Sequence, residues 1–269
     1  MAGLGIIERL DPIDLDELDA LAALLIRRDR KYVVPMRVAE LAVERLADAS
    51  RVLDIEGRRR FRYGSVYFDT PDHVSYLAAA HRRPRRFKVR TRSYLDSRRC
   101  LLEIKTRDPR GRTAKQRLGY SIERNDNLDG AARAFAAQCD LIGGRSALLA
   151  PALTTRYVRS TLLVDADGTR VTLDDGLEAW TPDGRTVFLP GMAIIETKTP
   201  GPPSKADRIL WSLGHRPARV SKFCTCLAAL RPDLPSNRWT RVLRQPWRRA
   251  DSRAARTEAI SDRSRSLAG

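Results

Sequence analysis

Alternating charge along strand-like segments is the feature that most constrains this fold. In residues 85–94, Lys88, Arg90 and Arg92 are separated by single apolar or β-branched residues. Successive side chains of a β-strand point to opposite faces of the sheet. The segment therefore predicts a strand with one cationic face and one face that can pack against a hydrophobic layer.

The same division recurs on five further segments. Their like-facing residues are Glu103 and Lys105; Lys115 and Arg117; Tyr157 and Arg159; Arg170, Thr172 and Asp174; and Glu196 and Lys198. One solvated face is common in antiparallel sheets, and for a single strand this interpretation would suffice. Because the stripe recurs on nearly every strand and helices must cover apolar sheet surface, we expect the charged faces to line the inside of a barrel.

The order of elements predicts an α+β fold: an eight-stranded antiparallel β-barrel with helices packed outside. Period-two segments bounded by turn residues predict strands at 30–35, 63–69, 85–94, 100–107, 112–122, 153–166, 170–177 and 192–199. Apolar residues at helical spacing predict helices at 36–49, 74–80, 128–140, 204–213 and 221–230.

Three parts are predicted along the chain. Residues 1–28 are an acidic leader with a short amphipathic helix, residues 29–230 are the barrel domain, and residues 231–269 are a basic, disordered tail. No apolar run is long enough to span a membrane, no secretory signal is visible, and four Cys fit a reducing compartment. These features predict a cytoplasmic protein, either free or peripheral at the inner membrane face, without a transmembrane segment of its own.

The charge balance predicts a polyanionic partner. The chain holds 50 Lys and Arg against 33 Asp and Glu, a net charge of +17. Aromatic residues do not interleave with the basic ones as they would in a base-stacking platform, which disfavours a specific nucleic acid. Unpaired cations inside a barrel would repel one another, and an anionic ligand relieves this. Lys and Arg suit phosphate oxygens and carboxylates suit Mg²⁺ or Mn²⁺, so the lumen fits a polyphosphate chain with a divalent metal.

Nine short motifs follow one another from residue 29 onward. They are Asp29-Arg30-Lys31-Tyr32, residues 65–70, residues 88–94, Glu103-Ile104-Lys105, Lys115-Gln116-Arg117, Tyr157-Val158-Arg159, residues 170–174, Glu196-Thr197-Lys198 and residues 219–223. Together they resemble the VTC domain (vacuolar transporter chaperone), a branch of the CYTH-like triphosphate tunnel metalloenzymes. Asp29 departs from the family's usual Glu, and Arg219 stands where Lys is common.

Lysine usage follows the same motifs. Only seven basic residues are Lys, and the other 43 are Arg. Because a compact ammonium and a planar guanidinium are not interchangeable, the retained lysines are candidates for sites that need an ammonium. Six of the seven lie on the motifs, and Lys205 is the exception.

The resemblance implies a metal-dependent polyphosphate polymerase, which transfers the terminal phosphate of ATP to a growing polyphosphate chain and releases ADP. It implies Mn²⁺ or Mg²⁺ as cofactor and ATP and inorganic polyphosphate as partners. The residues expected to hold the transferring phosphate are Arg90, Arg92, Lys105 and Lys115. The residues expected to bind phosphate or nucleotide are Lys31, Lys88, Arg117, Tyr157, Arg159, Lys198, Arg219 and Lys222. The expected metal ligands are Glu196 and, as weaker candidates, Glu103 and Asp174.

Two other functions stay open at this point. One is a hydrolase of tripolyphosphate or nucleoside triphosphates on the same fold, and the other is a non-catalytic polyanion-binding module. The sequence contains no P-loop and no Ser-His-Asp or Cys-His set, but phosphoryl transfer can proceed by positioning and charge stabilisation alone. Coupling to membrane transport would require a membrane partner protein. Cys224 and Cys226 lack a second pair and are expected to be structural.

Overall fold

Two compact units divide the chain. The computed structural model describes residues 5–21 and 28–250. Unit 1 comprises Met1–Tyr63, Tyr157–Leu177 and Gly191–Val220, and unit 2 comprises Gly64–Arg156, Glu178–Pro190 and Ser221–Gly269. Three long strands contribute residues to both units. They are β4 (Phe61–Asp69), β8 (Ala150–Val164) and β9 (Thr169–Trp180).

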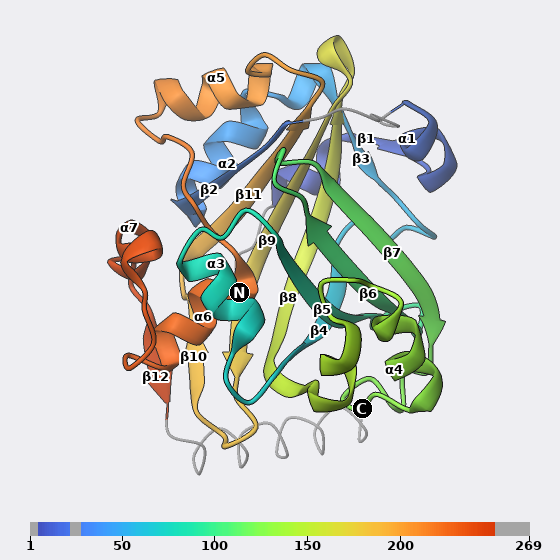
Figure 1. Ribbon diagram of the computed structural model, residues 1–269. Coiled ribbons are helices and arrows are strands. Elements are labelled where there is room, and N and C mark those ends of the chain that lie inside the picture. Colours follow the sequence, from blue (N-terminus) through green and yellow to red (C-terminus); the bar gives the residue numbers. More distant parts are fainter. Residues whose placement is uncertain (1–4, 22–27, 251–269) are drawn as a thin grey trace, which may run out of the picture. The chain divides into compact units, whose positions relative to one another are not determined.

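The remaining elements belong to one unit each (Figure 1). Unit 1 holds η1 (Gly5–Arg9), β1 (Asp11–Ile13), α1 (Leu15–Leu21), β2 (Arg28–Pro35), α2 (Met36–Glu44), η2 (Ala47–Ala49), β3 (Ser50–Leu53), η4 (Asp165–Asp167), β11 (Met192–Thr199) and α5 (Lys205–Ser212). Unit 2 holds α3 (Val74–Ala80), β5 (Arg86–Tyr94), β6 (Arg99–Arg107), β7 (Thr113–Tyr120), α4 (Gly130–Ala137), η3 (Gly143–Leu148), β10 (Thr186–Phe188), α6 (Lys222–Leu230), η5 (Asn237–Trp239), α7 (Thr240–Leu243) and β12 (Arg248–Ala250).

Twelve strands of the described residues form one sheet. Its main order is β12-β10-β9-β8-β4-β5-β6-β7, and β11 pairs with both β2 and β9. The α+β class and the antiparallel runs are confirmed, but the strand number differs from eight and the pairings among the described strands do not close into a ring. The additional strands β1, β3, β10 and β12 have three or four residues each. Such short segments carry too little period-two pattern to be predicted.

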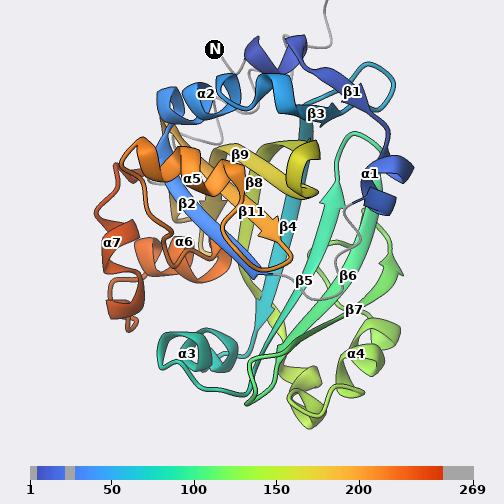
Figure 2. The same ribbon diagram turned by 90° about the horizontal axis from the view of Figure 1, so that it is seen from above.

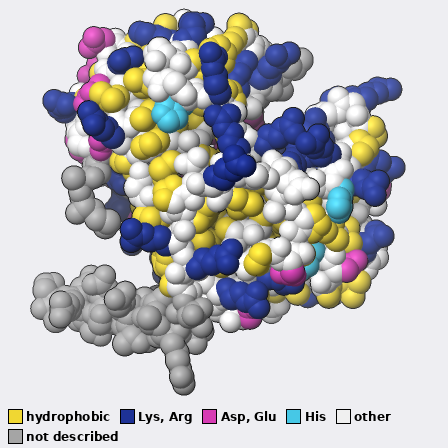
Figure 3. All heavy atoms as spheres, turned by 90° about the vertical axis from the view of Figure 1, so that its left-hand side faces the viewer, with side chains coloured by type: hydrophobic (Ala, Val, Ile, Leu, Met, Phe, Trp, Pro, Cys, Tyr) yellow, Lys and Arg dark blue, Asp and Glu magenta, His cyan; other side chains and the backbone are white. Residues whose placement is uncertain are grey.

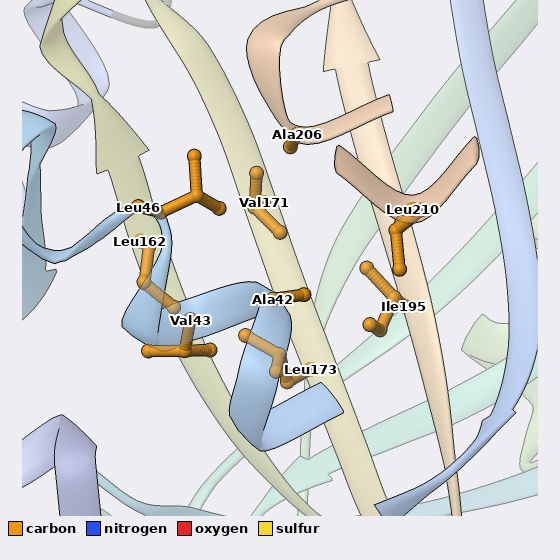
Figure 4. A pocket seen from close by; sticks show the side chains of 9 residues that line it. All are labelled: Ala42, Val43, Leu46, Leu162, Val171, Leu173, Ile195, Ala206 and Leu210. Atoms are coloured by element: carbon orange, nitrogen blue, oxygen red, sulfur yellow. The ribbon is translucent and has the colours of Figure 1, made fainter. Parts of the chain in front are cut away.

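In unit 1, the apolar face of β2, β11 and β9 packs under α2 and α5 (Figure 2). Nine apolar side chains, from α2, α5, β8, β9, β11 and the turn after α2, converge on a space of about 10 Å³ (Figure 4). Their positions 171, 173 and 195 alternate with the polar residues of the same strands. A space of this size holds no more than one water, so it is a packing detail and not a ligand site.

Beside this core, the carboxylate of Asp207 ties α5 to two strands. Asp207 is fully buried, and its Oδ1 accepts hydrogen bonds from Tyr32 (2.6 Å) and Thr197 (2.7 Å). Its Oδ2 lies 3.2 Å from the guanidinium of Arg30 and accepts from Ser204, whose hydroxyl caps α5 in return. Because the carboxylate satisfies partners on β2, β11 and α5 together, it fixes these elements in one arrangement.

In unit 2, the apolar face of β5 and β6 packs against α4 and the residues that flank η3 (Figure 1). This cluster contains Val89, Leu102 and Ile104 from the strands and Ala132 from α4. At the end of β4, the buried carboxylate of Asp69 accepts from the backbone N–H groups of residues 70, 75 and 76 at distances of 2.8–2.9 Å. Asp69 therefore fixes the start of α3 against the strand.

The ends of the chain differ in part from expectation. The helix predicted in the leader is present as α1, and Leu25 of its predicted apolar stripe lies outside the described residues. Within the predicted tail, residues 237–243 form η5 and α7 and residues 248–250 form β12, and the side chain of Trp239 is buried, so a disordered tail does not describe these residues. Residues 251–269 lie outside the described part. No helix of residues 5–21 and 28–250 has the length and apolar composition needed to cross a membrane.

We expect Asp207→Ala to destabilise the protein strongly, because it leaves buried donors on Arg30, Tyr32 and Ser204 without their acceptor. Breaking a buried, hydrogen-bonded ion pair costs about 3–5 kcal/mol. The change in the free energy of unfolding is measured by urea denaturation. Arg208→Ala, at the exposed neighbouring position, is the matched control and should change stability by less than about 0.5 kcal/mol. Equal midpoints for the two variants would contradict the proposed role of Asp207.

Candidate functional site

Three lysines of unit 2 lie directly opposite one another across three strands. Lys88 of β5 pairs in register with Lys105 of β6, and Lys105 pairs with Lys115 of β7. We call these three residues the lysine row. Like charges directly opposite each other destabilise an antiparallel pair. The repulsion between these lysines therefore costs free energy, and a bound anion would reduce that cost.

Next to the lysine row, one carboxylate is surrounded by four cations. Glu103 lies opposite Arg90 and Arg117, and its side chain is 1% exposed. Arg90 donates to Glu103 Oε2 at 2.6–2.8 Å, and Arg92 and Arg117 lie 3.5 and 3.4 Å from its oxygens. Lys115 also forms an ion pair with Glu103. Four positively charged side chains thus share the single carboxylate of Glu103.

The pKa values of this cluster follow from burial and charge. Burial disfavours the charged form of Glu103, but the charges of Arg90 and Arg92 and a hydrogen bond from Lys115 outweigh it and lower the pKa of Glu103 to about 2. Burial lowers the pKa of Lys115 to about 8, with a contribution from the two arginines, although Glu103 acts in the opposite direction. Glu103 is therefore ionised at neutral pH, whereas Lys115 is close to losing its proton.

Helix α6 closes one end of the lysine row. Lys88 Nζ donates to Ser221 Oγ at 2.8 Å, and the same oxygen accepts from the N–H of Cys224 as the cap of α6. Lys222 is the first residue of this helix. Lys88 and Lys222, predicted from distant motifs, are thus brought to the same end of one helix.

Unit 1 has its own charged face on β2, β11 and β9. Lys31, Glu196 and Thr172 lie opposite one another in register. Glu196 forms ion pairs with Lys31 and with Lys198, the latter at 3.9 Å. Burial favours the neutral form of Glu196, but the charges of the two lysines hold its pKa well below the usual value. Burial also lowers the pKa of Lys198 to about 8, against the attraction of Glu196.

Arg159 and Asp174 form a bidentate pair on the same unit. Arg159 donates to the two oxygens of Asp174 at 2.5 and 2.7 Å. The rings of Tyr63 and Tyr157 stack at 5.4 Å, and the guanidinium of Arg159 lies over both at 5.2 and 5.4 Å. Burial disfavours the charge of Arg159, yet Asp174 raises its pKa above the ordinary value. The pair and the two rings hold the guanidinium in one orientation.

A comparison with protein-family models shows the family of the chain. Residues 26–231 match the model described as the VTC domain. The chain belongs to the VTC domain family. This confirms the resemblance of the nine motifs, which lie within the matched residues. Among curated proteins, none matches the chain.

Solved structures with a related fold show low similarity. A candidate adenylyl cyclase of Hippeastrum with a dominant triphosphatase activity has 16% identity and a TM-score of 0.44, over 78% of this chain and 98% of its own. A candidate adenylate cyclase of Vibrio parahaemolyticus has 11% identity and a TM-score of 0.40, over 71% and 88%. The RNA triphosphatase Pct1 of S. pombe has 9% identity and a TM-score of 0.29, over 90% and 93%. At these scores the likeness adds nothing to the family match.

The predicted VTC-type residues fall into two sets. Unit 2 brings together the four residues expected at the transferring phosphate, with Lys88, Arg117 and Lys222 near them. Unit 1 brings together Lys31, Lys198, Arg159 and Tyr157. Arg219 is exposed and follows Ala218, whose N–H donates to the carbonyl of Lys31. Their roles in binding or catalysis stay predictions.

Each of the three predicted metal ligands is engaged by cations. Glu103 belongs to unit 2 and is held by arginines and Lys115, Glu196 is held by lysines, and Asp174 is held by Arg159. Among the described residues, no three side chains of His, Cys, Asp or Glu are grouped so as to hold a metal ion. A metal bound by protein groups alone therefore does not fit. Mg²⁺ held mainly by phosphates needs only one or two carboxylates, and ionised Glu196 suits that arrangement.

Sequence reasoning did not select three polar side chains of these faces as site residues, although it placed Thr172 on the charged face of its strand. Thr172 is 2% exposed, and its hydroxyl has no hydrogen-bond partner among the described residues although it lies in the row of Lys31 and Glu196. The hydroxyl of Ser221 accepts a hydrogen bond from Lys88, and the hydroxyl of Tyr67 accepts one from Arg90 at 3.2 Å. The alternation of β9 already places Thr172 on the charged face, but a hydroxyl carries no charge signal that would single it out.

We expect Glu103→Gln to destabilise the protein by about 3–5 kcal/mol, because four cations lose the one carboxylate among them. Tripolyphosphate should replace the lost negative charge and raise the melting temperature more in the variant than in the wild type. Differential scanning calorimetry with and without the ligand measures both effects. Glu123→Gln changes the same charge in an exposed pair with Arg98 and should affect neither quantity. An equal gain in wild type and Glu103→Gln would show that the phosphate binds elsewhere.

Proposed function

We propose that this VTC-domain protein is a polyphosphate polymerase that transfers the terminal phosphate of ATP to a growing polyphosphate chain. The lysine row carries the proposal: three like charges opposite one another, beside a carboxylate that already serves four cations. Such a face needs an anion with several charged oxygens in a line. Phosphate chains have this property, and the family match supports the assignment.

In the proposed reaction, the bond between the terminal phosphorus of ATP and its bridging oxygen breaks. A terminal oxygen of the polyphosphate chain forms the new bond, and ADP leaves. This nucleophile is already ionised, so no general base is required. Arg90, Arg92, Lys105 and Lys115 hold the oxygens of the transferring group, whose charge in the transition state they stabilise in a preorganised arrangement.

Unit 1, taken by itself, carries a separate set of cations that are also proposed to bind phosphate. Lys31 and Lys198 are compact ammonium groups, and Arg159 presents a guanidinium that Asp174 orients. Glu196 would offer an oxygen to Mg²⁺ or Mn²⁺ carried by a phosphate bound at this face of unit 1. When bound, the metal neutralises phosphate oxygens.

The ion pairing of the carboxylates favours the polymerase over a hydrolase. A hydrolase activates water, and a carboxylate base would assist that step. Glu103 and Glu196 have pKa values held low by neighbouring cations, and Asp174 is engaged at both oxygens by Arg159. Carboxylates stabilised as anions in this way are weak bases.

We expect the purified protein to convert ATP and a short polyphosphate primer to ADP and longer polymer in the presence of Mn²⁺ or Mg²⁺. Arg90→Ala and Lys105→Ala should each reduce the rate by at least about 100-fold, because each removes a charge from the transferring phosphate. Gel electrophoresis of the polymer and an ADP assay follow the reaction. Lys205→Ala is the matched control, because Lys205 is the lysine outside the motifs.

Other products would change the conclusion. Free phosphate without polymer would replace the polymerase with a hydrolase. Tight polyphosphate binding without turnover under any metal would leave a non-catalytic binding module. A full rate in Arg90→Ala and Lys105→Ala would exclude the face of β5 and β6 as the reaction site.

The affinity for tripolyphosphate should fall as the pH rises from about 8 to about 10, because Lys115 and Lys198 have pKa values of about 8 and lose their charge there. Below about pH 8 both ammonium groups are present, and above it binding must first protonate them. Lys115→Arg with Lys198→Arg keeps both charges and should flatten the dependence. Isothermal titration calorimetry at constant ionic strength measures it, with Lys205→Arg as control. An unchanged slope in the double variant would refute the assignment.

A further inference from the structure

One end of the β5–β6–β7 meander is lined by arginine. Seven of the residues at 82–86 and 107–112 are Arg, and we call the arginines of these two segments the arginine rim. Arg86 and Arg107 lie opposite each other in register, which joins the two segments at the end of β5 and β6. Arg82, Arg83, Arg85, Arg107 and Arg110 are exposed.

The rim has almost no compensating negative charge. Its one acidic residue, Asp108, accepts from the backbone N–H of Arg112 at 2.8 Å and from the Arg112 side chain at 2.7 Å. Burial and the charges of Arg107 and Arg238 lower the pKa of Arg86. The guanidinium groups of this end therefore repel one another in the absence of a ligand.

The rim continues the charged face of the candidate site. Arg86 precedes Lys88 by two residues on β5, and Arg107 follows Lys105 by two residues on β6. Residues two apart on a strand share a face. Arg86 and Arg107 of the rim therefore continue the lysine row along the same strands, and the other rim arginines lie in the segments that adjoin these strand ends. This arrangement suits a linear polyanion that extends beyond a triphosphate.

We propose that the arginine rim is a second binding surface for the polyphosphate chain, which holds chain units beyond those in the lysine row and makes affinity increase with chain length. This deepens the proposed function and rests on it, since it assumes that phosphate occupies the row. A membrane surface is the less suitable occupant. The exposed large apolar residues of the described chain are Leu15, Leu21, Ile55 and Leu148, and none lies in the rim to enter a lipid layer.

The test compares long-chain polyphosphate with tripolyphosphate by fluorescence competition at several salt concentrations. The rim variant combines Arg83→Gln, Arg85→Gln and Arg110→Gln, which are exposed positions. The control variant combines Arg37→Gln, Arg208→Gln and Arg241→Gln, also exposed, with the same change in net charge. Lys105→Ala reports on the row itself.

In the wild type we expect tighter binding of the long chain than of tripolyphosphate. The rim variant should lose about tenfold in affinity for the long chain, lower the slope of log K against log salt by roughly 2, and keep its affinity for tripolyphosphate within about twofold. The control variant should match the wild type with both ligands.

Three results would overturn the proposal, and they differ from a failure of the proposed function. Equal loss in the rim and control variants would show a general charge effect. A rim variant with unchanged long-chain binding would remove the rim from the binding surface. Loss of binding to vesicles of phosphatidylglycerol and phosphatidylcholine, with polyphosphate binding retained, would assign the rim to membranes. By contrast, no tripolyphosphate binding in the wild type, or none lost in Lys105→Ala, would refute the row as a phosphate site.

Discussion

Repulsion between the cations on one face of β5, β6 and β7 is the main physical constraint on the candidate site. On β5, β6 and β7 the register places Lys against Lys against Lys and, in the next row, Arg against Glu against Arg. Glu103 is the carboxylate of the second row, and it also forms an ion pair with Lys115 of the first row. The fold keeps these charges together because the opposite face of the same strands supplies the core under α4. Burial on one face of these strands therefore enforces crowding on the other. On the side of the molecule drawn in Figure 3, Lys and Arg side chains also predominate over Asp and Glu.

The charged face of unit 1 balances its charges differently. Glu196 forms ion pairs with two lysines and Asp174 with Arg159, so each of these three cations has a carboxylate partner. Unit 2 has an excess of cations around Glu103, which favours binding of anions. The charged residues of unit 1 are thus held in ion pairs, whereas the cations around Glu103 in unit 2 would be stabilised more by a bound anion.

Much of this arrangement was accessible from the sequence. The alternation at Lys88, Arg90 and Arg92 predicted the strand and its charged face, and the order of the motifs predicted the VTC family, which the match over residues 26–231 confirms. Register was not accessible, because spacing along one strand does not say which residue of the neighbour lies opposite. The lysine row and the four partners of Glu103 emerge only from pairing. The short strands β1 and β12 and the buried network of Asp207 also depend on contacts between segments far apart in the chain.

The position of Asp207 has a consequence for the opposite side of its strands. Tyr32 and Thr197, which it holds from the core, are the immediate chain neighbours of Lys31 and Glu196 on the charged side. Movement of β2 or β11 that displaced the charged side chains would break the hydrogen bonds of Tyr32 and Thr197 to Asp207 on the other face. The spacing of the ammonium and carboxylate groups is thus set before any ligand arrives, and little reorganisation energy remains to be supplied during a reaction. In unit 1, the hydrogen bonds of Asp207 therefore contribute both to the stability of the core and to the preorganisation of the polar face.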